Sequence, residues 1–333
     1  SYGVLMNLDQ TATNTFSVAE LGIRDLTNSI NNLIYNGDFY YWSKNTSAGK
    51  RPDLLSQGEL TFPISSELPQ AADGWQFTNI NGSFSSDSIK RVLIDTAVNK
   101  TTALQLTVQP DNSTTSTDPT VLEYRVPRAF EMSGRRLTFA LDFFCSTPNA
   151  ITIGIGQFQR TDAGLVLIQS DENVVKNFSG TVQVTTAAVV DADASIISFY
   201  VKFDPSLSIT ASLWHARAAV GQFPILPYAF VPDAADSLRG YYERGSFYLA
   251  TFAQVGTVLG SSTQFGSPKH LELGDLTART IPGPVTDRST NVNNITYSTN
   301  RDGINVSATA TASASVILQT EWEAFVKYTG SIV

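Results

Sequence analysis

Residues 32–43 read NLIYNGDFYYWS and mark a change of architecture along the chain. The apolar LIY suits a first buried strand, NGD is turn chemistry that tolerates positive φ, and FYYW places four aromatic residues in succession. The pattern before this stretch is helical and the pattern after it is rich in strand formers. We therefore expect a leading segment over residues 1–34, followed by a β domain over residues 35–231.

An apolar seam of helical spacing precedes this stretch, at Ile23, Leu26, Ile30 and Leu33. Intervals of three, four and three residues are typical of a heptad a/d seam, and a mixture of Ile and Leu favours more than two helices. Two heptads do not specify a coiled coil alone, so a single amphipathic helix remains the alternative. We expect a short trimerising helix and a homotrimer, with most of the subunit interface in the β domains because two heptads bury little surface.

The composition excludes several classes of partner. Only 16% of the 333 residues are charged, and the net charge of −8 is spread along the chain without any Lys/Arg cluster larger than a pair. Nucleic acid binding is therefore not expected. No run of about 18 apolar residues is present, so membrane insertion is not expected either. Low charge with abundant Ser, Thr and Asn is typical of an all-β extracellular or virion surface protein.

Alternation of apolar and polar residues dominates the region from residue 88 to residue 218. Turn residues separate short segments rich in Val, Ile, Leu, Phe and Thr, which predict an antiparallel jelly-roll sandwich. The predicted strands are residues 88–96, 103–108, 121–126, 136–144, 150–158, 166–170, 181–186, 196–203 and 208–218. Shorter strands are predicted at 60–64, and in a smaller β-rich domain over residues 232–333 at 246–255, 270–273, 294–298, 304–307, 313–319 and 322–328.

Several motifs resemble those of bacteriophage tail fibres and receptor-binding proteins whose β domain is a carbohydrate-binding-like jelly roll. They are the opening stretch with DGWQF at 73–77, LEYRV at 122–126 with MSGRRLTF at 132–139, SLWHARAAVG at 212–221 with PYAF at 227–230, and DSLRGYYERG at 236–245. AAVG at 218–221 replaces the family's usual QLE-G, so no role of that Gln or Glu is carried over. The resemblance implies a tail-fibre protein, made in the host cytoplasm, that contacts other phage tail or virion proteins and a host surface glycan.

Residues for catalysis are sparse. His215 lies in an apolar strand, where a hydrogen-bonded, half-buried histidine is the simpler interpretation, and His270 lies in a turn. Cys145 is interpreted as a buried strand thiol. No Gly-x-Ser-x-Gly elbow is present, and the DADAS at 191–195 lacks the glycine and closing Glu of a Ca²⁺ loop. We expect no enzyme activity, no metal site and no cofactor; related jelly rolls leave a structural calcium ion near Asp38 as an alternative.

Aromatic and polar residues around the opening stretch are the candidate ligand-binding set: Tyr40, Trp42, Trp75, Asn36 and Asp38. Aromatic rings stack on the apolar faces of sugars, while amides and carboxylates bind hydroxyls. Strand alternation would place either Tyr40 and Trp42 or their neighbours outward. The opposing interpretation makes Trp75 and Phe39 core residues.

The favoured function is non-covalent binding of a host saccharide by a virion attachment protein, through the sandwich or through a cleft between the sandwich and the terminal domain. The alternative is a purely structural fibre, baseplate or capsid-decoration module. A depolymerase is less favoured, because the sequence shows no carboxylate pair of defined spacing and no long β-helix.

Overall fold

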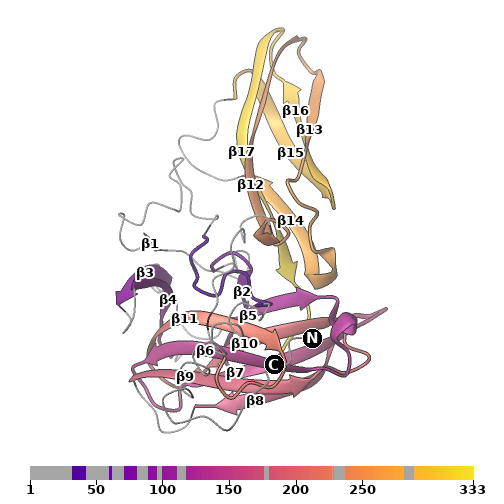
Figure 1. The fold of residues 1–333 in the computed structure, drawn as a ribbon. Coiled ribbons are helices and arrows are strands. Elements are labelled where there is room, and N and C mark those ends of the chain that lie inside the picture. Colours follow the sequence, from indigo (N-terminus) through magenta and orange to yellow (C-terminus); the bar gives the residue numbers. More distant parts are fainter. Residues whose placement is uncertain are drawn as a thin grey trace, which may run out of the picture.

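The computed structural model describes residues 32–42, 60–61, 71–80, 89–95, 100–110, 118–175, 180–226, 228, 237–280 and 289–333. Figure 1 shows a broad β-sandwich from which a narrow terminal domain projects. The named elements within these residues are strands and two 3-10 turns, so the all-β class is confirmed. The predicted helical positions Ile23, Leu26 and Ile30 lie outside the described residues, and Leu33 packs, partly buried, against the sandwich core.

The first layer of the sandwich is a six-stranded antiparallel sheet, in the order β1-β3-β4-β11-β6-β9. Its strands are β1 (Leu60–Thr61), β3 (Ile89–Asp95), β4 (Lys100–Val108), β11 (Ile209–Val220), β6 (Arg136–Cys145) and β9 (Gly180–Val189). Strand β11 carries a bulge between Trp214 and Arg217, where its register against β6 shifts. The bulge allows His215 to adopt a left-handed backbone with φ of 48°.

The second layer is a five-stranded antiparallel sheet, in the order β2-β5-β10-β7-β8. Its strands are β2 (Trp75–Asn79), β5 (Thr120–Pro127), β10 (Ile196–Phe203), β7 (Ile151–Thr161) and β8 (Gly164–Val174). Apolar side chains from both sheets, including Phe139 of β6 and Phe199 of β10, meet in one buried core. The nine strands predicted between residues 88 and 218 are thus confirmed as β3 to β11, because each alternating segment buries one face against the opposite layer.

The terminal domain consists of two three-stranded sheets around a core of its own. One sheet has the order β12 (Tyr242–Ala253), β17 (Ala314–Tyr328), β14 (Gly274–Thr280), and the other β13 (Val258–Gln264), β16 (Gly303–Ala310), β15 (Val292–Asn300). The two strands predicted over 313–328 are one continuous strand, β17. The strand predicted at 270–273 is wrong: Leu271–Leu273 forms a 3-10 turn, η4, and β13 and β14 were not predicted.

The end of the chain returns from the terminal domain to the sandwich (Figure 1). Val326, Tyr328 and Ile332 belong to the sandwich core rather than to the core of the terminal domain. Tyr328 Oη donates to Gly74 O over 2.7 Å, and Tyr328 N donates to Gln76 Oε1 over 3.1 Å. Since these atoms are buried, the contacts fix how the terminal domain is mounted on the five-stranded sheet.

A buried ion pair anchors the same returning segment. Arg125 Nε lies 2.8 Å from Glu123 Oε2, and both side chains are fully buried. The guanidinium also donates to Thr329 O and Gly330 O, and it lies between the rings of Phe158 and Tyr328. The N–H groups of the guanidinium thus make hydrogen bonds while its flat faces pack on aromatic rings. A lysine ammonium has no flat face and could not make both kinds of contact.

Candidate functional site

The NGDF turn closes the sandwich onto the bulge of β11. Ala216 N donates to Gly37 O over 2.7 Å, and a Cβ on Gly37 would lie 1.9 Å from Ala216 O. Only glycine permits this approach of two backbones. The buried Asn36 side chain donates to Tyr41 O and Asp73 O and accepts from Tyr41 N, so the amide organises the turn itself.

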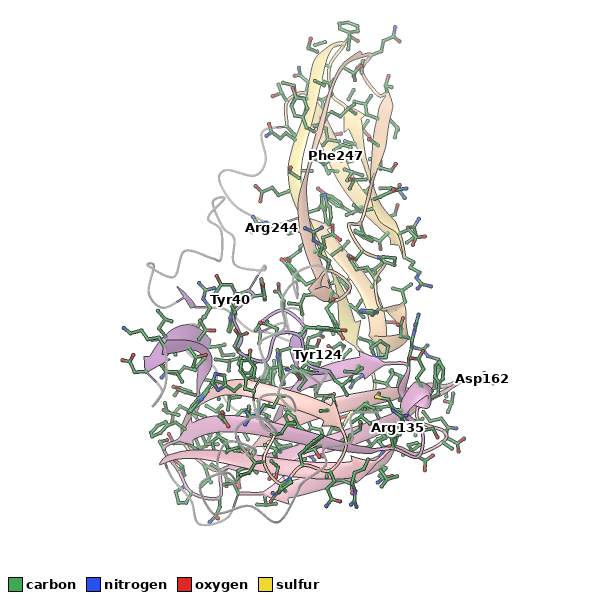
Figure 2. The ribbon with its side chains drawn as sticks, in the orientation of Figure 1. Tyr40, Tyr124, Arg135, Asp162, Arg244 and Phe247 are labelled. Atoms are coloured by element: carbon green, nitrogen blue, oxygen red, sulfur yellow. The ribbon has the colours of Figure 1, made fainter. Side chains whose placement is uncertain are left out.

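A row of aromatic rings runs from this turn to the base of the terminal domain. The ring centroids of Phe39 and Trp75 are 5.0 Å apart, those of Trp75 and Tyr124 5.4 Å, those of Tyr124 and Tyr241 5.4 Å, and those of Tyr241 and His270 4.9 Å. Figure 2 shows Tyr124 below the point where the terminal domain leaves the sandwich. The aromatic motifs of the sequence therefore build the junction between the two domains.

Three residues of the predicted ligand set are buried, which corrects that part of the prediction. Asn36 and Trp75 have no exposed surface and Trp42 has 1%, so none of the three can contact a ligand in this structure. The strand alternation assumed for FYYW is wrong because Phe39 has a left-handed backbone, with φ of 53°, and both Phe39 and Trp42 turn inward. Tyr40 remains half-exposed, beside β3, where Arg91 donates to its carbonyl (Figure 2).

Asp38 belongs to a polar cluster on the outer side of the six-stranded sheet. Its carboxyl is hydrogen-bonded to Tyr228, and burial raises its pKa, although the backbone N–H of Tyr40 and nearby His215 oppose that shift. His215 stacks on Tyr228 with centroids 4.3 Å apart, and its Nδ1 lies 3.1 Å from Asp142 Oδ2. These contacts connect the NGDF turn, the β11 bulge and the segment at Tyr228 that follows β11. We therefore interpret the cluster as structural.

A pocket of about 540 Å³ lies between the sandwich and the terminal domain. Its volume is within the range of small-molecule sites. The sandwich contributes Tyr35 together with Arg128 and Glu131 from the start of η3 (Ala129–Met132), and the terminal domain contributes His270, Glu272 and Arg301. Tyr241, the last tyrosine of the aromatic row, also lines the pocket.

The pocket combines an accessible ring with charged groups. The side chain of Tyr35 is 38% exposed, while Ser237 and Ser267 supply hydroxyls. Arg128 and Glu131 form a loose pair at 3.7 Å, and His270 Nδ1 lies 3.3 Å from Glu272 Oε1. The hydrogen bond from His270 lowers the pKa of Glu272, and Arg301 acts in the same direction. The arrangement suits non-covalent recognition of a polyhydroxylated ligand: one ring face for stacking and several polar groups around it.

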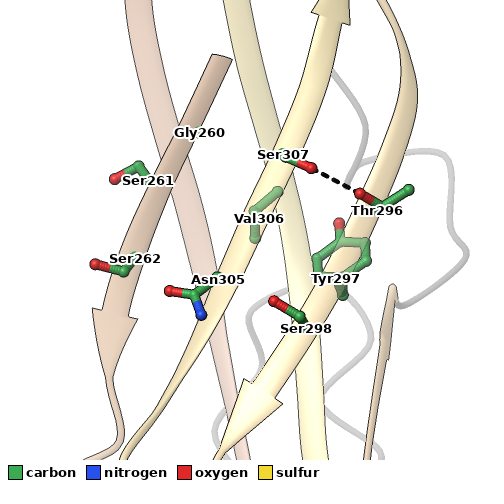
Figure 3. Close-up of a pocket in the computed structure, with 9 residues that line it drawn as sticks. All are labelled: Gly260, Ser261, Ser262, Thr296, Tyr297, Ser298, Asn305, Val306 and Ser307. Atoms are coloured by element: carbon green, nitrogen blue, oxygen red, sulfur yellow. Dashed lines mark hydrogen bonds between the residues drawn. The ribbon is translucent and has the colours of Figure 1, made fainter. Parts of the chain in front are cut away.

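A second hollow, of about 410 Å³, lies on the sheet β13-β16-β15 (Figure 3). Small polar side chains line it, among them Ser262, Asn305 and Ser298, and Thr296 shares a 2.7 Å hydrogen bond with Ser307. No charged side chain lines it, and the ring of Tyr297 is tied to Thr320 by a 2.9 Å hydrogen bond. Without a charged side chain it offers less specific recognition than the interdomain pocket.

The pocket residues Tyr35, Arg128 and Arg301 were not predicted as site residues. Tyr35 was assigned to a buried strand, and Arg128 and Arg301 lie in short connections that carry no periodic signal. The one available signal is their position beside turn residues, at PR in 127–128 and NRDG in 300–303. The pocket itself arises only when two domains meet, so no local pattern marks it.

The residues that the structure describes include no cluster of three or more His, Cys, Asp or Glu side chains suited to a metal ion. Among the same residues, no helix has the length and hydropathy of a membrane span. Cys145 is buried, as predicted, and burial raises its pKa. Asp142 and Glu123 lie in different sheets, and Asp162 lies in the exposed β7–β8 turn (Figure 2).

Neither a protein-family model nor a curated protein matches the chain. Among solved structures, it is similar to the C-terminal family 22 carbohydrate-binding module of Clostridium thermocellum Xyn10B, with 13% identity, a TM-score of 0.30, and coverage of 47% of this chain and 91% of that one. It is also similar to CBM28, a carbohydrate-binding module specific for non-crystalline cellulose, with 9% identity, a TM-score of 0.29, and coverage of 44% of this chain and 89% of that one. The similarity to the enzymatically active domain of bacteriophage CBA120 tailspike protein 4 has 11% identity and a TM-score of 0.32. It covers 44% of this chain but 19% of the tailspike chain. Such low values assign neither a family nor a function.

Proposed function

We propose that this chain is a non-catalytic attachment protein of a phage virion and that it binds a host cell-surface saccharide in the interdomain pocket. The observation that carries this proposal is the joint presence in the pocket of the exposed Tyr35 ring, serine hydroxyls and charged side chains from both domains. A pyranose presents an apolar ring face and a rim of hydroxyls, and these are the groups that such a pocket accommodates.

One shallow site of this kind has a modest affinity, on the order of millimolar to tens of micromolar. Presentation of three copies in the homotrimer, and of several fibres on one particle, raises the apparent affinity by on the order of a hundredfold or more through effective concentration. The homotrimer and the virion location are parts of the proposal, and they explain why one weak site per subunit is sufficient for attachment.

The test is adsorption of the purified chain to a glycan array and to host cells, comparing the parent with Tyr35→Ala and Tyr40→Ala. Thermal unfolding first establishes that each variant is folded. Loss of binding in Tyr35→Ala alone supports the interdomain pocket. Loss in Tyr40→Ala alone moves the site to the NGDF turn, and an array without any bound saccharide contradicts saccharide binding.

The alternative is a purely structural fibre module, which one observation favours. Tyr248 and Phe252 are 65% and 70% exposed, and their even spacing places them on one face of β12. Exposed aromatic residues on one strand are typical of a protein contact. A folded parent that forms higher assemblies but binds no saccharide and no host cell supports this alternative.

A further inference from the structure

We infer that the interdomain pocket selects a saccharide that carries a carboxylate, held by Arg128 from the sandwich and Arg301 from the terminal domain. This inference deepens the proposed function and rests on it. Arginine presents a planar fork of N–H donors that matches a carboxylate, and such charge-assisted hydrogen bonds are about twice as strong as neutral ones.

The backbone of Arg128 is the first line of support. Its φ and ψ are 61° and 41°, in the left-handed region that favours glycine or asparagine. Among the described residues with positive φ other than glycine, three are asparagines: Asn149, Asn291 and Asn294. An arginine there carries a conformational strain that either smaller residue would relieve.

Side-chain packing offsets the backbone strain at Phe39 and His215 but not at Arg128. Phe39 is fully buried in the core, and His215 is hydrogen-bonded to Asp142 and stacked on Tyr228. The Arg128 side chain, by contrast, is 70% exposed and lines the pocket. Among the described residues its only side-chain partner is Glu131, at 3.7 Å, and an exposed pair at that distance contributes little to stability. Strain at a residue whose side chain has no strong stabilising contact points to a role in binding.

Arg301 faces the same pocket from the other domain. It lies in the turn between β15 and β16, where its carbonyl accepts from Lys269 N over 3.2 Å. The backbone is thereby fixed, while the side chain is exposed and lines the pocket. Two guanidinium groups supplied by different domains make the anion site complete only in the assembled chain.

The acidic residues of the pocket already have hydrogen-bonding or charged partners beside them. Glu272 accepts from His270, and Arg301 also stabilises its charge. Glu131 is more than half exposed at the rim, beside Arg128. A ligand carboxylate competes well with Glu131, because the exposed Arg128–Glu131 pair at 3.7 Å is screened by water and contributes little.

The test measures binding of the full chain to matched pairs of probes by titration calorimetry. One pair is trigalacturonate and its methyl ester, and the other is 3′-sialyllactose and its methyl ester. We expect the acid member of at least one pair to bind about tenfold or more tightly, as a charge-assisted hydrogen bond implies. Arg128→Asn and Arg301→Gln should each reduce that preference to about twofold or less, and Arg135→Gln, an exposed arginine outside the pocket, should preserve it.

Arg128→Gly separates a binding role from a structural one. Because glycine relieves the left-handed strain, this variant should unfold at or above the parent's midpoint while losing the acid preference. Equal binding of acid and neutral members, or an acid preference that survives both arginine variants, would overturn the inference and leave saccharide binding in place. No binding to these probes or to a panel of neutral oligosaccharides would remove the proposed function as well.

Discussion

The ring of Tyr124 in β5 lies 5.4 Å from the ring of Tyr241, which immediately precedes β12. One tyrosine belongs to the sandwich and the other to the root of the terminal domain, and both are buried in the same core. Tyr241 Oη also donates to Arg125 O over 2.8 Å. The two domains are therefore mounted on each other by core packing, which gives the pocket between them a fixed shape.

Removing the buried cation of this junction should destabilise the protein. Arg125→Ala leaves Glu123 charged and without its arginine in the interior, so we expect a loss of about 3–5 kcal/mol in the free energy of unfolding. Urea denaturation measures it. A double variant, Glu123→Gln with Arg125→Met, should recover part of the loss. A single variant as stable as the parent would show that the pair does not anchor the returning segment.

The glycine of the DGW motif should be irreplaceable for steric reasons. Gly74 has φ of 84°, and a Cβ there would lie 2.5 Å from the Tyr124 ring, whereas Gly134 has φ of 72° and open space around it. Gly134→Ala should cost about 1–2 kcal/mol for the left-handed backbone alone. Gly74→Ala should cost about 1–3 kcal/mol more, because the core is overpacked. Equal losses in urea denaturation would contradict this explanation.

The aromatic residues of the opening stretch should separate into two classes. Trp42 is buried and donates to Phe39 O, so Trp42→Ala should cost about 3–5 kcal/mol. Tyr40 is half-exposed, and Tyr40→Ala should cost much less. Thermal unfolding followed by circular dichroism compares the two. A well-folded Trp42→Ala variant with impaired adsorption would instead restore the predicted ligand role of Trp42.

Acid should weaken the terminal domain partly through Glu272. The hydrogen bond from His270 lowers the pKa of this carboxyl below its ordinary value of 4.5. A lowered folded-state pKa contributes stability above the unfolded-state value, and that contribution is lost as the pH falls through the folded-state value. Urea denaturation from pH 7 to pH 3 should show a shallower acid decline for Glu272→Gln than for the parent. Parallel curves would exclude this contribution.

The proposed homotrimer should depend on the outer face of β12. Tyr248 and Phe252 are the exposed aromatic residues of that face, whereas the opposite sheet, β13-β16-β15, exposes small polar groups. We expect the parent to sediment as a trimer at micromolar concentration and Tyr248→Ser/Phe252→Ser to shift toward monomer. A monomeric parent would refute the trimer. A trimer lost instead in Leu26→Asp/Ile30→Asp would place the interface in the predicted helix.

Local sequence determined the strands of the sandwich. Most segments from β3 to β11 have one face of apolar side chains at a period of two, and that period is a property of consecutive residues. Gly37 and Gly74 were likewise readable as turn glycines. Only the tertiary structure shows that no side chain fits at these positions, because Ala216 O lies against Gly37 and the Tyr124 ring lies against Gly74. Both neighbours come from distant parts of the chain.

Tertiary structure decided the candidate site. The sequence shows aromatic residues at 39–42 and 75 but not their direction, and the left-handed backbone of Phe39 breaks the alternation, so that Phe39 and Trp42 are both buried. Arg128 and Arg301 are 173 positions apart in the numbering, and they line one pocket only because Tyr241 and Tyr328 dock the terminal domain on the sandwich. A site built from two domains depends on long-range packing, which a local pattern does not encode.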